Sequence, residues 1–140
     1  MTSNNLTLSI IKPDAIKNKN VGFIIDDIVK NDFNIIKIKK MTLNRDIASD
    51  FYIEHYKKSY YKSLIDYIIS YDIIVLLLSK KNAVEEFRNL IGDKDPKKAN
   101  KLSIRYKYGK SIQENSIHGS SSIVSAKREI SFFFSKVELL

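Results

Sequence analysis

The sequence has no cysteine, and it has only two prolines and four glycines in 140 residues. Without cysteine, disulfides and thiolate metal sites are excluded. The small share of proline and glycine, together with 44% apolar residues, is ordinary for a globular protein and argues against a disordered one. The length fits a single domain that covers residues 1–140 and is large enough for a real core.

Long hydrophobic runs are also missing. The longest apolar run covers residues 73–78, which is far too short to cross a bilayer, so no membrane partner is expected. The first five residues are mostly polar and do not form a hydrophobic signal segment. We therefore expect a cytoplasmic protein.

Positive charge, in contrast, is in excess. The chain has 24 lysines and arginines against 16 acidic residues, a formal net charge of +8. Such a balance favours anionic partners, namely nucleotides, nucleic acid or acidic membrane surfaces. Much of the excess is scattered lysine, which commonly only solvates a surface, so charge alone does not choose among these partners.

Hydrophobic periodicity predicts four strands with helices between them. The predicted strands cover residues 6–11, 33–42, 72–79 and 116–118, and the predicted helices cover 21–30, 47–55, 60–70, 82–91 and the segment from 123 onward. The third strand is apolar throughout, as expected for a central strand with both faces covered. The second strand alternates, as expected for one buried face.

This order of elements predicts an α/β protein of the α+β type. The expected fold is a ferredoxin-like βαββαβ arrangement, in which helices cover a four-stranded antiparallel sheet. A long basic loop, residues 93–114, is expected before the last strand, and loops of this length tend to be functional. A terminal helix follows the last strand, which we expect at an edge of the sheet.

One of the two histidines, His118, stands just before a glycine turn and the final helix, which Ser121 or Ser122 is expected to cap. The N-terminus of a helix favours anions. Neutral imidazole is a nucleophile, and a carboxylate on the following helix could hold one ring nitrogen while the other faces a substrate. A lone histidine beside a glycine is more often a surface or core residue. The other histidine, His55, lies among tyrosines and is expected to be structural.

The chain lacks both glycine-rich phosphate-binding motifs, Gly-x-x-x-x-Gly-Lys and Gly-x-Gly-x-x-Gly. Phosphate would therefore have to be held by side chains. Lys12 at a strand end, Arg88 on a helix and Arg105 in the basic loop offer the point charge and the bidentate forks that a polyphosphate needs.

Three segments, in the right order along the chain, resemble the nucleoside diphosphate kinase family, and the likeness covers nearly the whole chain. They are Ile10-Ile11-Lys12-Pro13-Asp14-Ala15, then Phe51-Tyr52-Ile53-Glu54-His55 followed by Tyr60, and finally Asn115-x-x-His118-Gly119-Ser120 followed by Arg128-Glu129-Ile130. The resemblance implies an enzyme that moves the γ-phosphate of a nucleoside triphosphate such as ATP to nucleoside diphosphates. It also implies ping-pong turnover, with one site serving donor and acceptor in succession.

The resemblance assigns roles around the reacting group. His118 would form a phosphohistidine, Glu129 would orient its imidazole, and Ser120 would support that pair. Lys12 would contact phosphate and the ribose hydroxyls, and Tyr52 would lie against the histidine and the phosphate site.

Further roles concern the nucleotide. Arg88 and Arg105 would clamp the phosphates, and Asn115 would contact the ribose 3′ oxygen. Tyr60 and Ile112 would pinch the base from its two faces, which ignores base identity. Mg²⁺ would be held mainly by the nucleotide phosphates rather than by a protein cage. The family also implies a homo-oligomer, a tetramer or a hexamer, to which the apolar tail 137–140 could contribute contacts.

The sequence departs from the family pattern at six positions. They are Lys94 for a phosphate-contacting Thr, Ser121 and Val124 for an acidic pair, Lys107 for an acid, Ser103 for a Thr, and Tyr60 for a Phe. Lys94 could still reach phosphate through its ammonium group. Loss of the acidic pair removes a capping box, which costs about 0.5–1 kcal/mol at the helix start.

Two other functions compete with the kinase. A basic ferredoxin-like module could bind nucleic acid, but such modules stack bases on aromatic residues of the central strands. Here the central strands are aliphatic and the tyrosines lie on helices, so nucleic acid is not expected as the main partner. An inactive interaction module is opposed by the joint presence of His118, Glu129, Lys12, Arg88 and Arg105.

Overall fold

The computed structural model describes residues 3–135. Its strands are β1 (Leu6–Ile11), β2 (Asn34–Met41), β3 (Ile73–Ser79) and β4 (Ile117–Gly119), and its α-helices are α1 (Pro13–Lys17), α2 (Val21–Lys30), α3 (Arg45–Phe51), α4 (Tyr61–Ile68), α5 (Ala83–Ile91), α6 (Ile104–Tyr108) and α7 (Ile123–Phe133). Short 3₁₀ turns, η1 (Ser3–Asn5) and η2 (Ile53–His55), complete the elements. The tail 137–140, expected to contact a neighbouring subunit, lies outside the described residues.

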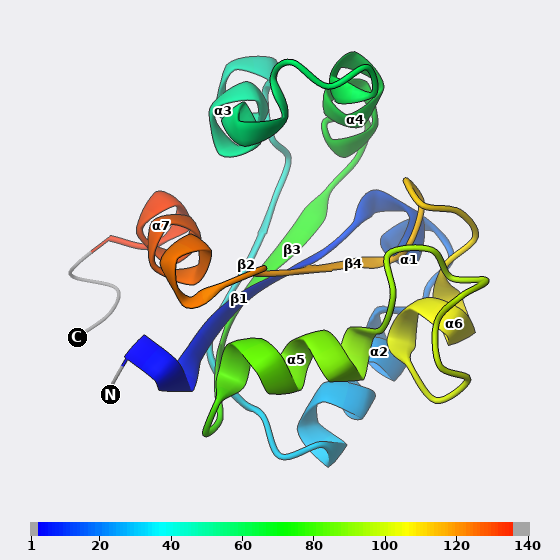
Figure 1. The fold of residues 1–140 in the computed structure, drawn as a ribbon. Coiled ribbons are helices and arrows are strands. Elements are labelled where there is room, and N and C mark those ends of the chain that lie inside the picture. The colour runs from blue at the N-terminus through cyan, green and yellow to red at the C-terminus, as the bar shows by residue number, and fades with distance from the viewer. Residues whose placement is uncertain (1–2, 136–140) are drawn as a thin grey trace.

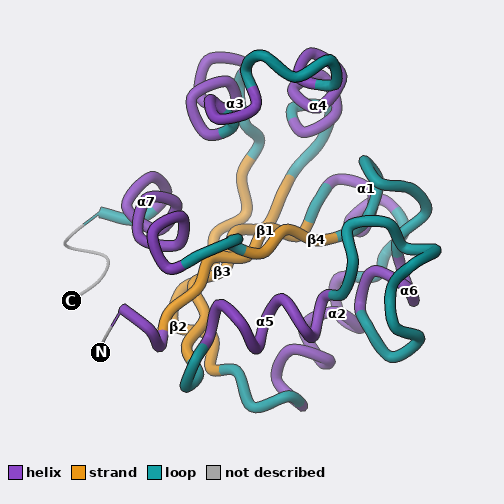
Figure 2. Tube along the Cα trace, viewed as in Figure 1, coloured by secondary structure: helices purple, strands orange, loops and turns teal. Residues whose placement is uncertain are grey.

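The four strands form one sheet in the order β2-β3-β1-β4, and every neighbouring pair is antiparallel. The predicted ferredoxin-like sheet is therefore confirmed, including the position of the last strand at an edge. Helices cover both faces: α3, α4 and α7 lie on one side, and α2 and α5 lie on the other (Figure 1). The tube view shows the same two layers with the strands between them (Figure 2).

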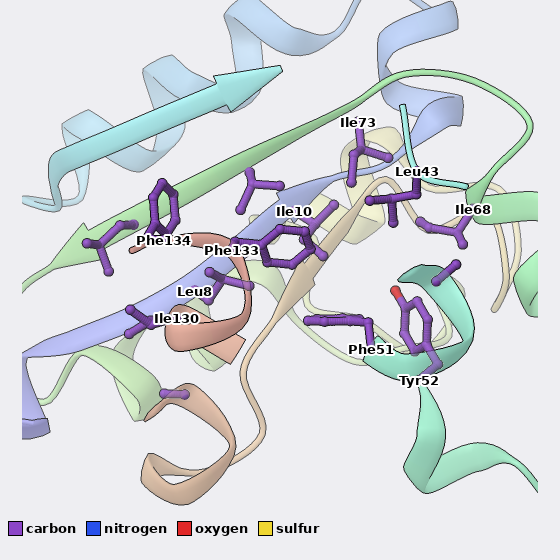
Figure 3. Packing of buried hydrophobic residues seen from close by; sticks show 14 of the residues in the cluster. Leu8, Ile10, Leu43, Phe51, Tyr52, Ile68, Ile73, Ile130, Phe133 and Phe134 are labelled. Atoms are coloured by element: carbon purple, nitrogen blue, oxygen red, sulfur yellow. The ribbon is translucent and has the colours of Figure 1, made fainter. Parts of the chain in front are cut away.

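Alternation along β1 and β3 divides the apolar side chains between two cores. One core packs against α3, α4 and α7 and takes the sheet residues Leu8, Ile10, Ile73, Val75 and Leu77 (Figure 3). The other packs against α2 and α5 and takes Ile11, Ile74, Leu76 and Leu78. Full burial of one such side chain contributes about 1.5–3 kcal/mol. The central strands β1 and β3 are thus held from both sides, and β1 pairs with the edge strand β4.

β3 is buried at every position, as its apolar run predicted. The prediction for β2 was wrong in detail, because this edge strand has no fully buried residue. Its register against β3 shifts between Ile35 and Lys37, so the simple alternation of faces is interrupted, and Ile38 is 53% exposed.

Three helical predictions also need correction. Helix α3 begins after Asn44, whose Oδ1 accepts a hydrogen bond from the Ile47 amide, but it ends at Phe51, and residues 53–55 form a 3₁₀ turn. The loop 93–114 contains the helix α6, which Ser103 caps by accepting from the Tyr106 amide. The short α1 starts at Pro13, where the sequence had indicated only a strand stop. All three are single turns or helix ends, where periodicity carries little signal.

Candidate active site

The position of His118 follows from the register of β4. His118 pairs with Ile10 of β1, whose side chain faces the core beneath α7, and so the imidazole points to the same face. Gly119 faces the opposite side, where an added Cβ would lie 2.8 Å from the Phe87 ring and 2.9 Å from Ile91. The glycine therefore allows β4 to lie directly against α5.

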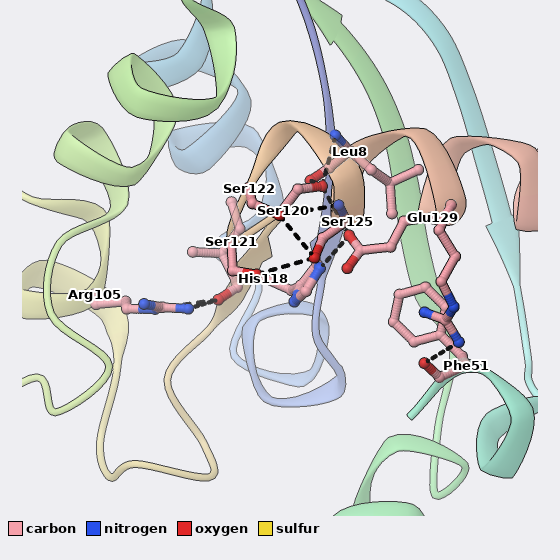
Figure 4. A network of polar contacts seen from close by, with 11 residues as sticks. Leu8, Phe51, Arg105, His118, Ser120, Ser121, Ser122, Ser125 and Glu129 are labelled. Atoms are coloured by element: carbon pink, nitrogen blue, oxygen red, sulfur yellow. Dashed lines mark hydrogen bonds and ion pairs between the residues drawn. The ribbon is translucent and has the colours of Figure 1, made fainter. Parts of the chain in front are cut away.

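A carboxylate on α7 meets the histidine. Glu129 lies on the inner face of the helix with Ala126, Ile130 and Phe133. The His118 Nε2 atom lies 2.8 Å from Glu129 Oε1, and the Ser120 hydroxyl donates to the same oxygen at 2.7 Å (Figure 4). Ser120 Oγ in turn accepts from the Leu8 amide at 3.3 Å. The ring is thus held through Nε2, and among residues 3–135 no hydrogen bond engages Nδ1.

Electrostatics keep Glu129 ionised. Burial opposes the charged form, but the hydrogen bond and charge interaction with His118, the hydroxyl of Ser120 and the charge of Arg128 together lower the pKa of Glu129. An ionised carboxylate accepts a hydrogen bond from Nε2–H, and this selects the tautomer in which Nδ1 carries a lone pair. The geometry therefore presents Nδ1 as a nucleophile.

Lys12 follows β1 and is 7% exposed. Its ammonium donates to the Gln113 carbonyl at 3.0 Å and to Asn115 Oδ1 at 2.9 Å. Asn115 is also buried, and its Nδ2 donates to the Lys94 carbonyl at 2.9 Å. These bonds tie the basic loop to the end of β1, and they leave one N–H of the ammonium for a ligand. Burial and the charge of Arg105 lower the pKa of Lys12 to about 8, while Asp14 opposes that shift.

A pair formed by the buried Asp14 and the partly buried Tyr67 lies beside Lys12 and was not predicted as part of the site. The Tyr67 hydroxyl donates to Asp14 Oδ1 and accepts from the Asp14 amide at 2.9 Å. Burial and the Asp14 hydrogen bond raise the pKa of Tyr67. The Lys12 ammonium lies 5.9 Å from the centre of the Tyr67 ring. Asp14 stands in the first of the three family-like segments, and this was the only indication in the sequence that it could belong to the site.

A cationic cavity opens beside β4. Its walls include the predicted phosphate contacts Arg88, Lys94 and Arg105, together with Asp93 and Gly119. Arg105 is braced by bonds from Nη1 to the Gly92 carbonyl at 3.0 Å and from Nε and Nη2 to the Ile117 carbonyl at 3.2 and 2.9 Å. Burial and the charge of Arg88 lower its pKa to about 10, against the opposing charge of Asp93, so the guanidinium is charged at neutral pH.

A second hollow lies on the imidazole side of Gly119. His118, Glu129 and the predicted Tyr52 line it, and so do His55 and Arg128. Gly119 borders both hollows, so the cationic cavity and the hollow that His118 lines adjoin at β4. Tyr52 is 7% exposed, and burial together with the charge of Glu129 raises its pKa. Sequence reasoning placed His55 outside the site, but it borders the same hollow as His118.

The two predicted base contacts, Tyr60 and Ile112, are both exposed, at 47% and 56%. Their segments meet where the Ser63 hydroxyl donates to Gln113 Oε1 at 2.7 Å. The Tyr60 hydroxyl lies 2.7 Å from His55 Nδ1, a contact that a Phe at this position would lack. An exposed aromatic ring and an exposed aliphatic side chain are both suited to contact with the face of a base.

Of the remaining departures, Ser121 borders the hollow that His118 lines, whereas Val124 and Lys107 line neither hollow. Ser122, rather than Ser121, caps α7 by accepting from the Ser125 amide at 3.0 Å. Val124 is 78% exposed. Lys107 turns toward α2, where its ammonium pairs with Asp27 at 2.5 Å.

Within residues 3–135 no group of three or more His, Cys, Asp or Glu side chains could hold a metal ion. The cavity walls carry three cations and one carboxylate. This donor set fits a divalent cation that arrives on phosphate oxygens, and it does not fit a protein cage. None of the helices in the described part of the chain has both the length and the apolar character that a membrane crossing requires.

Comparison with known proteins decides the family. The family model described as nucleoside diphosphate kinase matches residues 5–139. The chain belongs to the nucleoside diphosphate kinase family. A nucleoside diphosphate kinase of Helicobacter hepaticus is 44% identical over 133 residues, which are 95% of this chain and 97% of the relative. One from Histophilus somni is 40% identical over 95% of this chain and 94% of its own length.

Solved nucleoside diphosphate kinases share the fold. The Aquifex aeolicus enzyme superposes with a TM-score of 0.93 at 31% identity, over 96% of this chain and 97% of that one. The Halobacterium salinarum enzyme, solved in complex with CDP, gives a TM-score of 0.92 at 27% identity, over 96% and 90% of the two chains. The predicted family, fold and enzyme class are thereby confirmed, which favours the kinase over a nucleic-acid-binding module.

Proposed function

We propose that the chain transfers the γ-phosphate of a nucleoside triphosphate, with ATP as donor, to nucleoside diphosphates through a phosphohistidine at His118. The observation that carries this proposal is the bond from His118 Nε2 to Glu129, which leaves the Nδ1 lone pair available, while the next residue, Gly119, borders the cationic cavity. Nδ1 attacks the γ-phosphorus, the bond from phosphorus to the bridging oxygen breaks, and the nucleoside diphosphate leaves. An incoming diphosphate then attacks the phosphohistidine, and Nδ1 leaves as the free imidazole.

In this proposal the cations act on the phosphates. Arg88 and Arg105 clamp them, Lys12 supplies a buried point charge, and Lys94 adds an exposed one. Because Lys12 and Arg105 are held by carbonyl and amide oxygens before any ligand arrives, little reorganisation is needed as charge develops. Tyr52 forms part of the wall beside the imidazole, and Ser120 fixes Glu129.

The sugar and base are assigned to the outer part of the site. Asn115 and Lys12 contact the ribose, and Tyr60 and Ile112 stack on the two faces of the base. The exposure of both stacking residues supports contact without base-edge readout. Binding of CDP by the Halobacterium salinarum relative supports a site that admits a pyrimidine nucleotide.

Mg²⁺ is the proposed cofactor, bound to the nucleotide phosphates. When bound it offsets the phosphate charge. The side chains of the cavity then have a smaller charge to balance, and their task is to orient the phosphate chain toward Nδ1.

We also propose that residues 1–140 act as one domain within a closed homo-oligomer of four or six copies. One sheet carries both cores, which supports the single domain. Contacts between copies are supported by large apolar side chains that are exposed in the isolated chain. They are Phe23 at 62%, Ile38 at 53% and Leu102 at 83%. Light scattering at several concentrations tests the assembly, and a monomer at all of them contradicts it.

The proposed cytoplasmic location agrees with the use of nucleotide substrates.

The phosphohistidine is tested with γ-labelled ATP. The purified protein should take up label that is stable in alkali and labile in acid. The label should disappear in His118→Ala and persist in His55→Ala, because these are the two histidines of the chain. Label in His118→Ala, or an acid-stable label, contradicts the mechanism.

A further inference from the structure

The cationic cavity is lined by one carboxylate together with the cations that are proposed to bind phosphate. Asp93 lines the cavity with Arg88, Lys94 and Arg105. An acid in a phosphate site opposes the binding of a polyanion, so its presence needs a physical account. Its neighbour Asp95 is not among the residues that line the cavity.

Asp93 is held in place by its own turn. Its Oδ1 accepts a hydrogen bond from the Asp95 amide at 2.8 Å. The preceding Gly92 has φ +86°, and its carbonyl accepts from Arg105 Nη1 at 3.0 Å. The turn is thereby fixed to the arginine that is proposed to bind phosphate, and the second oxygen of Asp93 remains available.

The charge of Asp93 acts on the site. It raises the pKa of Arg105 against the effects of burial and of Arg88. The same charge must act on any ligand of Arg105. A nucleoside diphosphate without a metal carries two more negative charges than its complex with a divalent cation, so Asp93 repels the free nucleotide more strongly.

We propose that Asp93 is a specificity-determining residue that makes the cavity prefer nucleotides carrying a divalent cation over the metal-free nucleotides. The inference rests on the proposed function, because it takes this cavity as the phosphate site. Two effects act in the same direction. The carboxylate repels the uncompensated phosphate chain, and its second oxygen attracts a phosphate-bound cation, directly or through a water ligand. Because Asp93 is exposed, screening limits the effect to roughly two- to fivefold in affinity.

The matched variants are Asp93→Asn and Asp95→Asn. Asparagine keeps Oδ1, which accepts the Asp95 amide in one turn and the Lys97 amide at 3.0 Å in the other, so each variant loses a charge while its turn is preserved. Binding of ADP is measured calorimetrically with excess Mg²⁺ and, separately, with EDTA. The measured quantity is the ratio of the Kd for metal-free ADP to the Kd for Mg·ADP.

Asp93→Asn should lower this ratio by roughly two- to fivefold, mainly by tightening the binding of metal-free ADP, and the change should shrink at high salt. Asp95→Asn should leave the ratio as in the wild type. An unchanged ratio in Asp93→Asn, or an equal change in both variants, overturns the inference while leaving the phosphohistidine proposal intact. Failure of both forms of ADP to bind the wild type overturns the site assignment and this inference with it.

Discussion

The proposed site has two parts that differ in burial and in support. The floor consists of Lys12, Asn115, His118, Ser120 and Glu129, and the rim consists of Tyr60, Asp93, Lys94 and Ile112. Floor residues lie on or directly beside β1, β4 and α7, and their polar groups are joined by hydrogen bonds. Rim residues are exposed and lie on turns and loops.

The departures from the family pattern follow this division. Lys94 and Tyr60 belong to the rim, Ser121 and Val124 are exposed at the start of α7, and Lys107 pairs with a helix outside the site. Ser103, although buried, keeps a hydroxyl cap. In the proposed mechanism, the hydrogen-bonded floor holds the reacting groups and the rim adjusts how nucleotides are captured.

The largest effect on activity beyond loss of the nucleophile is expected for Glu129→Gln. The neutral amide can donate to Nε2, and it then stabilises the tautomer whose Nδ1 lacks a lone pair. We expect phosphoenzyme formation to slow on the order of 10²- to 10⁴-fold with little change in nucleotide affinity. Rapid-quench measurement of the label tests this, with the thermal midpoint as the folding control. A loss below tenfold would show that the floor does not select the tautomer.

The next largest effect is the pH dependence of stability and of ADP affinity that follows from the titration of Lys12. Its pKa of about 8 in the folded chain lies below the ordinary value of 10.5. Because the unfolded chain binds more protons between these values, stability should rise with pH from about 8 toward 10.5. Affinity for ADP should fall in the same range, by up to about tenfold per pH unit, because the buried lysine loses its charge.

Lys12→Met is the control for that prediction, because it removes the titrating group. Calorimetric ADP titrations at closely spaced pH values should show the fall near pH 8 in the wild type and no such step in the variant. The same step in both proteins would assign the titration to another group.

A smaller effect is expected at the rim from Tyr60. Tyr60→Ala should weaken the binding of ADP and of CDP by similar amounts, about 1–3 kcal/mol, because stacking does not depend on base identity. Tyr60→Phe keeps the ring and removes the hydroxyl bonded to His55, so it should cost less than about 1.5 kcal/mol. In the wild type, a purine-to-pyrimidine preference in kcat/KM above roughly a hundredfold, or about 2.7 kcal/mol, would instead require hydrogen-bonded readout.

The smallest effect is expected from Lys94→Thr. The ammonium should add a screened point charge to the phosphate site, so the variant should bind ADP more weakly by about 1 kcal/mol, with a shallower salt dependence. Lys97→Thr in the same loop is the control, because Lys97 does not line the cavity. Calorimetry at two salt concentrations decides the question, and equal or tighter binding by Lys94→Thr at low salt would exclude the lysine as a phosphate ligand.

Periodicity predicted the strands and long helices because each buries a regular apolar face. It missed α6, whose five residues span little more than one turn, and it misjudged β2, where a register shift interrupts the alternation. The family-like segments located His118, Glu129 and Lys12. They did not reveal the Asp14–Tyr67 pair, which joins residues 53 positions apart, or the place of Asp93 on the cavity wall. Such contacts depend on tertiary packing that local patterns do not encode.

The close approach of Gly119 to α5 also protects against mispairing. A shift of β4 by one residue along β1 would turn its side chains to the opposite faces of the sheet. Either His118 or Ser120 would then have to occupy the space beside Phe87 and Ile91, where even a methyl group would lie within 3 Å of both. Steric overlap disfavours that shifted register, so an edge strand of three residues suffices to fix the direction of the imidazole. A side chain at position 119 would bring the same clash into the correct register, and the pairing that turns His118 toward Glu129 would then lose its steric advantage over the shifted one.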